Sequence, residues 1–414
     1  MKFADSIKLS VPIRSGTGGN MKRNRFGVFC STALSVAILA LALSGCSGDK
    51  GAKKEESAEP YKIGAIFSVT GRGAPIGQPE RETAELMRDQ INAAGGINGR
   101  MIELIVEDDE GDETKAMMAA KKLIEKDGVI AIIGPSLSGP TLAISQYVAE
   151  AQVPMVACAA SVKIVDPVNP WVFQVALTDR HSVNKILTYL ASQGINKIAF
   201  INDSNAYGVS GKAEMTALAP KKGVEVVAWE AFGGEDTDMT PQLTRVKASG
   251  AQAIVVWGTN PGPAVITRNM KQLKMTIPLV QSHGVANMKY IELSGEASEG
   301  VVLPAGRLIV ANQLPDSDPQ KQVLLDYTKA FAEKYNKPPD HYGGHGYDAI
   351  MLTAKAVEKA GADRSLIRET LEKTSGFIGT DGIFNITPED HNGLSEDSFV
   401  MVRVENGQWK LLDQ

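Results

Sequence analysis

The sequence predicts an α/β protein of two lobes, each built on a parallel sheet with helices on both faces. From Tyr61 onward, short apolar runs rich in Val and Ile alternate with longer stretches of helical period. Most runs begin about 25 residues apart, which is the length of one βα unit. Two series of such units therefore predict two sheets. The composition, 43% hydrophobic and 22% charged, is that of a globular protein.

The strands of the first lobe are expected near Lys62, Ile102, Val129 and Pro154. Those of the second are expected near Lys197, Val224, Ala253, Pro278 and Gly300. Helices fill the intervals. In residues 80–94 and 114–127 the apolar side chains share one helical face, and Gly95 is a plausible C-terminal cap.

A third segment follows, with helices expected at 318–335, 343–360 and 364–373. A hairpin is expected at the end, with strands at 398–404 and 409–412 joined by an Asn-Gly turn at 406–407. This segment has too few strands for a sheet of its own. We expect it to return across the interface and complete both lobes. Several chain crossings would form a hinge, with a ligand cleft between the lobes.

The N-terminus is typical of a targeting segment. Met21 begins a short basic run, residues 26–43 carry no charge, and Leu43-Ser44-Gly45-Cys46 resembles a bacterial lipobox. We expect residues 1–45 to be a signal peptide, with Met21 as a possible true start, and Cys46 to be lipidated. Residues 46–60 would be a flexible tether. The alternative is a membrane anchor helix, since eighteen apolar or uncharged residues can span a bilayer.

The charge distribution argues against one class of partner, and the cysteine content argues against an internal disulfide. The formal net charge is −5, but residues 1–45 hold six basic side chains and one acidic one, so the remainder is −10. An acidic body without a basic stretch argues against nucleic acid as a partner. After removal of Cys30 and acylation of Cys46, only Cys158 would remain, so no internal disulfide is expected.

Motifs for catalysis, cofactors or metals are mostly absent. No P-loop, dinucleotide fingerprint, HExxH or CxxC is present. Ser136 lies in a near miss for a nucleophile elbow and would need a histidine partner. His341 and His345 have a spacing that could hold zinc on a helix, but Gly343-Gly344 favours a surface or hinge loop. The acidic run 107–113 reads as a solvated strand end, with a weak calcium site as the alternative. We expect no enzyme, no cofactor and no metal.

Two loops after strands offer hydroxyls and free backbone amides. Residues 133–139 and 157–161 both follow strands at the edge where open α/β sheets bind ligands. Such groups near a helix start suit a carboxylate. The alternative is that Ser138 and Ser161 only cap helices.

The body, about residues 61–414, resembles the type I periplasmic solute-binding proteins of ABC transporters, in the branched-chain amino acid binding group. The resemblance rests on KIGAIFSVTG from Lys62, Gln90 to Gly99, Ile133-Gly134-Pro135, Ala206-Tyr207-Gly208 and Ser298-Glu299-Gly300. It implies two α/β lobes joined by three crossings, here 61–179 with about 306–385 and about 180–305 with about 386–414. It also implies an extracytoplasmic, lipid-anchored monomer that binds a small solute and serves an ABC permease.

The resemblance further implies how a ligand is held. The carboxylate would contact Ser138 and the turn Ala159-Ala160-Ser161, and the ammonium of an amino acid would contact Tyr207 and an acidic residue. At the position of that acid this sequence has His283. Residues near Ile76 and Asn260 would complete the wall, as would Trp257 if it is not a core residue.

The departure at His283 matters because a buried ammonium needs a carboxylate partner. The sequence therefore favours an acid without an α-amino group, and its overall pattern is similar to that of family members that take up aromatic acids. Asp179, Asp203 or Glu230 could still hold an ammonium, so an amino acid ligand stays open. A solvent-facing His283 and a purely structural Tyr207 also stay open.

The residues are compatible with three functions. The first is a transport binding protein for a small carboxylate, with an aromatic monocarboxylate favoured. The second is a ligand sensor that acts through a separate receptor. The third is a hydrolase using Ser136 or Ser138, which requires a histidine within hydrogen-bond reach of the serine.

Overall fold

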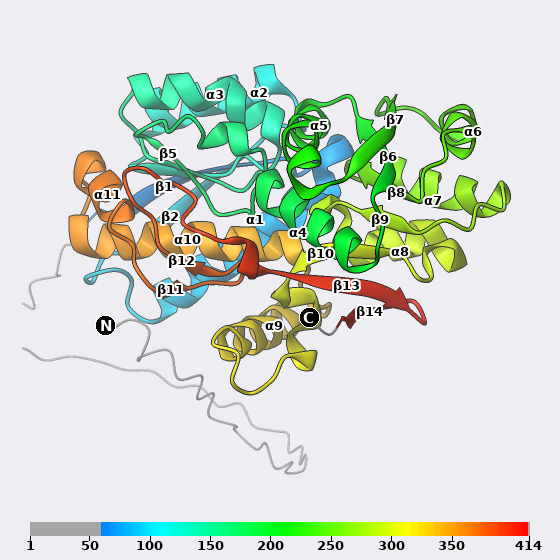
Figure 1. Ribbon diagram of the computed structural model, residues 1–414. Helices are drawn as coiled ribbons and strands as arrows, with labels where there is room; N and C mark the ends of the chain where they lie inside the picture. The colour runs from blue at the N-terminus through cyan, green and yellow to red at the C-terminus, as the bar shows by residue number, and fades with distance from the viewer. Residues whose placement is uncertain (1–58, 413–414) are drawn as a thin grey trace, which may run out of the picture. The chain divides into compact units, whose positions relative to one another are not determined.

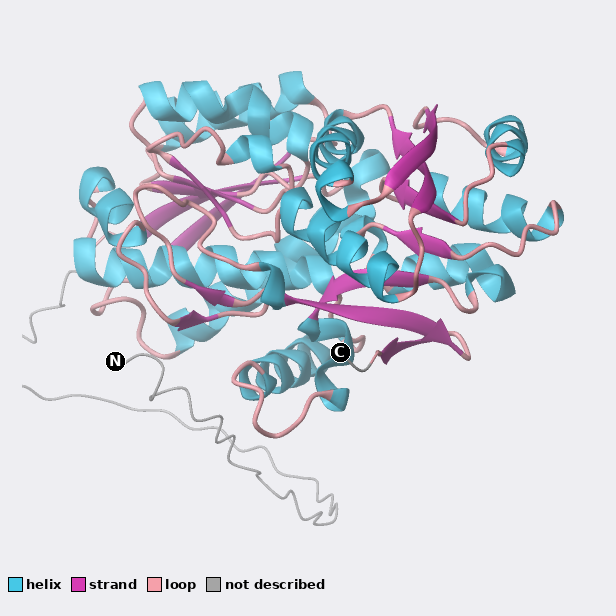
Figure 2. Ribbon diagram, in the orientation of Figure 1, coloured by secondary structure: helices cyan, strands magenta, loops and turns pink. Residues whose placement is uncertain are grey.

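Two sheets, one after the other along the chain, carry the fold (Figures 1 and 2). The computed structural model describes residues 59–412, so the signal peptide, Cys46 and most of the tether lie outside the described part. The first sheet has the order β2-β1-β3-β4-β5, and all its neighbours are parallel. Its strands are β1 Tyr61–Phe67, β2 Ile102–Asp108, β3 Ala131–Ile133, β4 Met155–Ala157 and β5 Val172–Gln174.

The second sheet has the order β14-β13-β10-β9-β8-β6-β7. The five strands from β10 to β7 are mutually parallel, whereas β13 and β14 are antiparallel additions at one edge. The strands are β6 Lys197–Asp203, β7 Glu225–Phe232, β8 Ala253–Trp257, β9 Leu279–Gln281, β10 Val302–Gly306, β13 Phe399–Glu405 and β14 Gln408–Leu411.

Both sheets use the same strand order. β2-β1-β3-β4-β5 in the first corresponds to β7-β6-β8-β9-β10 in the second. In each, the direction of winding reverses beside the first strand, between β1 and β3 and between β6 and β8. Loops that leave the carboxyl ends of the strands diverge at such a point and leave a crevice for a ligand.

Helices cover both faces of each sheet. In the first lobe α2 Glu113–Lys121 packs with α3 Ser138–Glu150 on one face, and α1 Ala74–Ala93 packs with α10 His341–Ala360 on the other. In the second lobe, α4 and α5 cover one face and α6, α7 and α8 cover the other. Their bounds are α4 Asp179–Ser192, α5 Ala206–Leu218, α6 Thr240–Ala248, α7 Gly262–Gln272 and α8 Met288–Ser294. Sheets buried on both sides explain the nearly continuous apolar strands.

The chain passes between the sheets three times within residues 59–412. It leaves the first after β5, returns after β10 and leaves again after the short hairpin β11 Phe377–Ile378 and β12 Ile383–Phe384. The returning segment contains α9 Lys321–Tyr335, α10 and α11 Arg364–Leu371, and it covers the first lobe (Figure 1). The predicted fold class, with two lobes and a three-crossing hinge, is confirmed. The predicted residue limits of the two lobes stay a proposal.

Most predicted elements are present, with two differences. The hairpin of β13 and β14 is confirmed, and Asn406 and Gly407 at its turn both have positive φ, of 53° and 70°. Helix α1 begins at Ala74, six residues earlier than predicted, because Pro75 lies in the first turn, where its missing N–H is tolerated. The short strands β5, β11 and β12 were not predicted, because Gln174 breaks the apolar run of β5 and the other two have only two residues each.

No helix among the described residues is long and apolar enough to cross a membrane.

A prediction concerns the turn after β3, which carries the chain to the start of α3. Gly134 has φ of 82°, and a Cβ there would lie 2.1 Å from the carbonyl oxygen of Ile66. We expect Gly134→Ala to lower the free energy of unfolding by about 3 kcal/mol, since the clash adds to the left-handed conformation. The matched control is Gly128→Ala, which has φ of 71° but open space, and should lose only about 1 kcal/mol. Equal losses in urea denaturation would contradict the clash.

Candidate functional site

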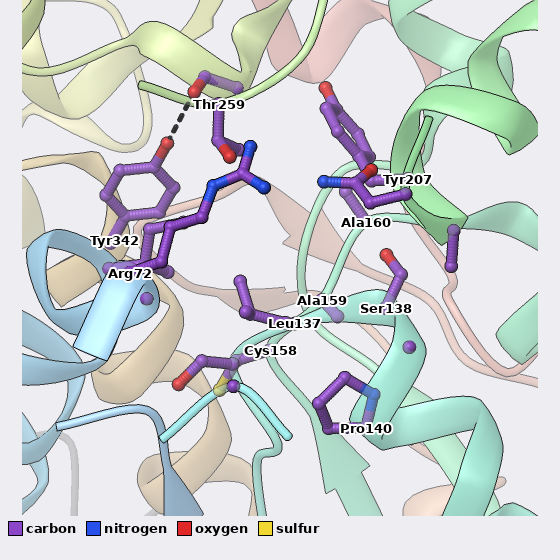
Figure 3. Close-up of a pocket in the computed structure, with 18 of the residues that line it drawn as sticks. Arg72, Leu137, Ser138, Pro140, Cys158, Ala159, Ala160, Tyr207, Thr259 and Tyr342 are labelled. Atoms are coloured by element: carbon purple, nitrogen blue, oxygen red, sulfur yellow. Dashed lines mark hydrogen bonds between the residues drawn. The ribbon is translucent and has the colours of Figure 1, made fainter. Parts of the chain in front are cut away.

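A cavity of about 260 Å³ lies where the two crevices face each other, between the carboxyl ends of the two sheets. Segments after β1, β2, β3 and β4 and the start of α10 line one side, and segments after β6, β8 and β9 line the other (Figure 3). Its lining includes Arg72, Ile76, Glu110, Glu113, Ser136, Leu137, Ser138, Cys158, Ala159, Ala160, Tyr207, Thr259, His283, Tyr342 and His345.

The start of α3 provides an anion site on the side of the first lobe. Ser138 is the first helical residue, and Leu137 before it is extended and gives no side-chain cap. The first amides of a helix have no acceptor within it and carry its positive dipole end. Ser138 and Gly139 both line the cavity. The position before the helix belongs to Leu137, so Ser138 is not the cap of α3.

Ser161 takes a different role from the predicted one. Its Oγ accepts the amide of Lys163 and bonds to Ser210 Oγ at 2.8 Å, so it caps the short 3₁₀ helix 162–164. Its backbone amide donates to Ser138 Oγ at 3.3 Å. The Ser161 side chain is fully buried and does not line the cavity. In this geometry the hydroxyl points away from the cavity and the amide orients Ser138, so a ligand contact of Ser161 stays a prediction.

Across the cavity, Tyr207 and His283 form a neutral pair. The Tyr207 hydroxyl and His283 Nδ1 lie 3.3 Å apart, and the rings meet edge to face. Burial lowers the pKa of His283 well below its usual range, and the neighbouring His341 and His345 lower it further. His283 Nε2 is buried without a partner among the described groups. The solvent-facing alternative for His283 is wrong, and Tyr207 lines the cavity as predicted.

The remaining predicted positions divide between the cavity and the core. Ile76, Ala159 and Ala160 line the cavity, whereas Asn260 does not. Asn260 Nδ2 lies 3.5 Å from Asn287 Oδ1. Trp257 is fully buried and stacks on Phe200, which confirms its core role.

Two contacts join the lobes across the cavity. Arg72 Nη2 lies 2.5 Å from Asp203 Oδ2, and the Tyr342 hydroxyl donates to the Gly284 carbonyl at 2.8 Å. Figure 3 shows the Arg72 side chain extending between Tyr342 and Tyr207. Together with the Ser161–Ser210 contact, these contacts link the two lobes beside the cavity.

None of the three acids proposed for an ammonium is free to take that role. Asp203 is paired with Arg72, and Glu230 is paired with Arg245 at 2.7 Å. Asp179 is fully buried and accepts the amide of Val162, and burial raises its pKa to about 7. Of the acids that do line the cavity, Glu110 pairs with Lys115 at 2.6 Å, which leaves Glu113.

The serine hydrolase arrangement is not formed. Ser136 Oγ donates to Glu80 and accepts the amide of Ser68, while Ser138 Oγ accepts the amide of Ser161. Neither hydroxyl bonds to a histidine among the described residues.

The acidic run 107–113 is not wholly a solvated strand end. Asp109 is fully buried and accepts the Ser68 hydroxyl at 2.6 Å, and Asp108 accepts the amide of Val69. These carboxylates hold the loop after β1, so this prediction was partly wrong.

His341 and His345 are not in a surface or hinge loop. They lie in the first two turns of α10 and are 1% and 3% exposed. Asp340 caps the helix by accepting the amide of Gly343, which allows two glycines inside the first turn. The loop was predicted because Gly343 and Gly344 disfavour a helix, and the capping role of Asp340 was not recognised.

Three lining residues were not predicted as ligand contacts, namely Arg72, Tyr342 and His345, whereas Thr259 belongs to the stretch 257–260 that was expected to supply part of the wall. Tyr342 and His345 come from a segment distant in sequence from both series of βα units. Asp340 was the only sequence signal for a helix that starts at His341. That this helix start faces the cleft depends on tertiary packing, which the sequence does not show.

Comparisons with known proteins agree with this architecture. A family profile described as "Periplasmic binding protein" matches residues 60–408. The chain is 27% identical to a leucine-, isoleucine-, valine-, threonine- and alanine-binding protein of Pseudomonas aeruginosa, over 84% of this chain and 91% of that one.

Solved structures give the same result. An extracellular ligand-binding receptor from Rhodopseudomonas palustris superposes with a TM-score of 0.80 and 28% identity, covering 85% of this chain and 99% of that chain. A branched-chain amino acid transporter substrate-binding protein from Streptococcus pneumoniae, in complex with isoleucine, gives 0.76 and 25%, with the same coverage of 85% and 99%.

A prediction follows from the buried Asp179. Because its pKa is raised in the folded state, the protonated form is retained as pH rises, and stability is lost between about pH 4 and pH 7. We expect Asp179→Asn to remove this loss, so that the variant gains roughly 3 kcal/mol on the wild type between pH 4.5 and pH 8. Urea denaturation at both pH values measures the difference. Asp397→Asn, at an exposed site, is the control and should show no such gain.

Proposed function

The chain belongs to the periplasmic binding protein family, and we propose that it captures a small carboxylic acid for an ABC importer. The family places it outside the cytoplasmic membrane, among proteins that bind solutes and are not enzymes. The favoured solute is an aromatic monocarboxylate, held in the cavity between the lobes. The permease is the partner that would receive it.

The start of α3 supports binding of the carboxylate. Ser138 and Gly139 line the cavity at the positive end of a helix dipole, where the first backbone amides have no acceptor within the helix. Charge-assisted hydrogen bonds from such donors are about twice as strong as neutral ones. Ala159 and Ala160 are small, so they leave space for the carboxylate between the turns after β3 and β4.

The opposite wall carries the argument against an α-amino group. Tyr207 and His283 face the cavity without a negative charge, and a neutral imidazole cannot replace a carboxylate as partner of a buried ammonium. His283 Nε2 is free to donate to, or accept from, a hydroxyl or keto group of the solute.

The body of the solute would contact apolar groups. Ile76, Leu137, Tyr207 and Tyr342 line the cavity. Tyrosine rings favour the faces and edges of an aromatic solute over an aliphatic one of equal area. This favours an aromatic monocarboxylate.

An amino acid is the second candidate. It is favoured by the similar proteins, which bind branched-chain and other small amino acids according to their names. It is also favoured by Glu113, the cavity acid for which no ion pair is formed in the described chain. However, Glu113 lies beside Gly139, at the carboxylate end of the cavity. An amino acid would then need both its charged groups at one wall.

We also propose a lipid anchor on Cys46 and a tether through residues 46–60, on the lipobox sequence alone. The tether would let the folded part move near the membrane while it stays attached. We also propose that the protein is a monomer. A sensor that signals through a separate receptor would use the same cavity, so ligand binding alone does not separate it from the importer role.

The first test is a thermal-shift screen of the purified protein against benzoate-type acids, leucine, isoleucine, valine, dicarboxylates and amides. A solute at one hundred times its Kd stabilises the folded state by about 2.7 kcal/mol. We expect shifts of several degrees with aromatic monocarboxylates and none with their amides. Shifts with branched-chain amino acids alone would reject the aromatic acid in favour of the second candidate.

The second test is a matched pair of variants. His283→Glu introduces a negative charge at the wall, and should weaken binding of the best aromatic acid at least about tenfold in calorimetry. His283→Gln keeps a neutral hydrogen-bonding group and should stay within about threefold of the wild type. If both variants bind the acid like the wild type, His283 does not contact the solute. Circular dichroism checks that both are folded.

A further inference from the structure

The first two turns of α10 bring two buried histidines to an aspartate from a distant loop. His341 and His345 are one helical turn apart, and their ring centroids are separated by 4.5 Å. Asp381 lies in the turn between β11 and β12. One ligand atom from each of the three residues lies within 4.8 Å of the others. We call this cluster of His341, His345 and Asp381 the triad.

His341 has no partner that explains its burial. Its side chain is 1% exposed, and neither Nδ1 nor Nε2 has a hydrogen-bond partner among the described groups. Its nearest charged atom is Asp381 Oδ1, 3.8 Å from Nδ1, which is too far for a hydrogen bond. An unsatisfied buried polar atom costs about 1–3 kcal/mol, so a ligand on Nδ1, the nitrogen that faces Asp381, would remove one of the two unsatisfied atoms.

The surroundings of His341 leave room beside its ring. Gly306 approaches it from β10, and a Cβ at that position would lie 3.0 Å from His341 Nδ1 and 3.7 Å from Asp381 Oδ1. Any larger residue would therefore crowd the space between the histidine and the aspartate. The glycine keeps this space free.

The aspartate is held in place and is not paired with a basic side chain other than histidine. Asp348 accepts the backbone amides of Thr380 and Asp381, both at 2.8 Å, which fixes the loop that presents Asp381. In residues 59–412 the ion-pair contacts of Asp381 are only with the two histidines, 2.6 Å to His345 and 3.8 Å to His341. A buried carboxylate in this position is stabilised by a cation.

We propose that the triad binds one divalent first-row transition ion, of the Zn²⁺ class. Two imidazole nitrogens and one carboxylate oxygen are a donor set that such ions prefer, whereas Mg²⁺ and Ca²⁺ prefer oxygen alone. Donors around a tetrahedral zinc ion lie about 3.3 Å apart. His345 Nδ1 lies 2.6 Å from Asp381 Oδ2 and His341 Nδ1 lies 3.8 Å from Asp381 Oδ1, and one donor atom of each residue lies within 4.8 Å of the others. Side-chain rotation would bring the three donors to the spacing of a bound ion.

The cavity gives the ion a route to the triad. His345 lines it, so three protein ligands would leave a coordination position on the cavity side. The proposal does not depend on which solute the protein carries, because it concerns the metal alone. The sequence could not show the triad, since Asp381 is 36 residues from His345 and no local motif links them.

The experiment is a titration of the purified, chelator-treated protein with Co²⁺, followed by competition with Zn²⁺. We expect one equivalent of Co²⁺ with the visible absorption of low-coordinate cobalt, and its displacement by Zn²⁺. His345→Gln and Asp381→Asn should each weaken binding at least about 100-fold, since each removes a ligand. Asparagine has nearly the same shape as aspartate, so Asp381→Asn should fold even if His345→Gln does not. The test then does not depend on the histidine variant alone.

The control is His181→Gln, which removes a histidine outside both the triad and the cavity lining and should bind Co²⁺ like the wild type. Absence of stoichiometric binding to the wild type overturns the proposal. Binding that persists in both triad variants also overturns it, because the ion would then be held elsewhere on the acidic surface. Solute binding is measured in a separate experiment. If the proposed solute does not bind, the outcome of the metal titration is unaffected.

Discussion

The shared strand order of the two sheets is the constraint on which the site depends. Because each sheet reverses its winding beside its first strand, the loops after β1 and β3 face those after β6 and β8. The start of α3 is then aimed into the space between the lobes, and α5 brings Tyr207 to the opposite side. The cavity arises from topology before any single side chain is considered.

This arrangement gives the cavity two chemically different walls. The wall of the first lobe offers helix amides and a hydroxyl, which suit a carboxylate whatever the net charge of the surface. The wall of the second lobe offers Tyr207 and a neutral His283. Arg72 joins the lobes by pairing with Asp203, so the Asp203 carboxylate is already neutralised by a cation of the protein.

The sequence predicted the parts of the fold that repeat along the chain. The apolar strands, the helices between them and the Asn406-Gly407 hairpin carry local signals that packing does not override. Strand β5 was missed, because Gln174 breaks its short apolar run.

In the site, Ser138, Tyr207 and His283 lie at the starts of helical segments that follow strands, where topology gives the direction. The sequence is a poorer guide where direction depends on packing. Ser161 turns its hydroxyl to Ser210, Asn260 points to Asn287, and His341 is carried inward by a helix whose glycines indicated a loop. The contact between His345 and Asp381 could not be predicted at all, because it joins two segments that lie 36 residues apart and share no local motif.

A solute carboxylate bound at the start of α3 would be seen in a crystal structure of the protein with the aromatic acid that stabilises it most. We expect the carboxylate oxygens to lie within hydrogen-bond distance of the amides of Ser138 and Gly139, with the ring between Tyr207 and Tyr342. A carboxylate bound instead at His283 and Tyr207, or outside the cavity, would contradict binding at the start of α3.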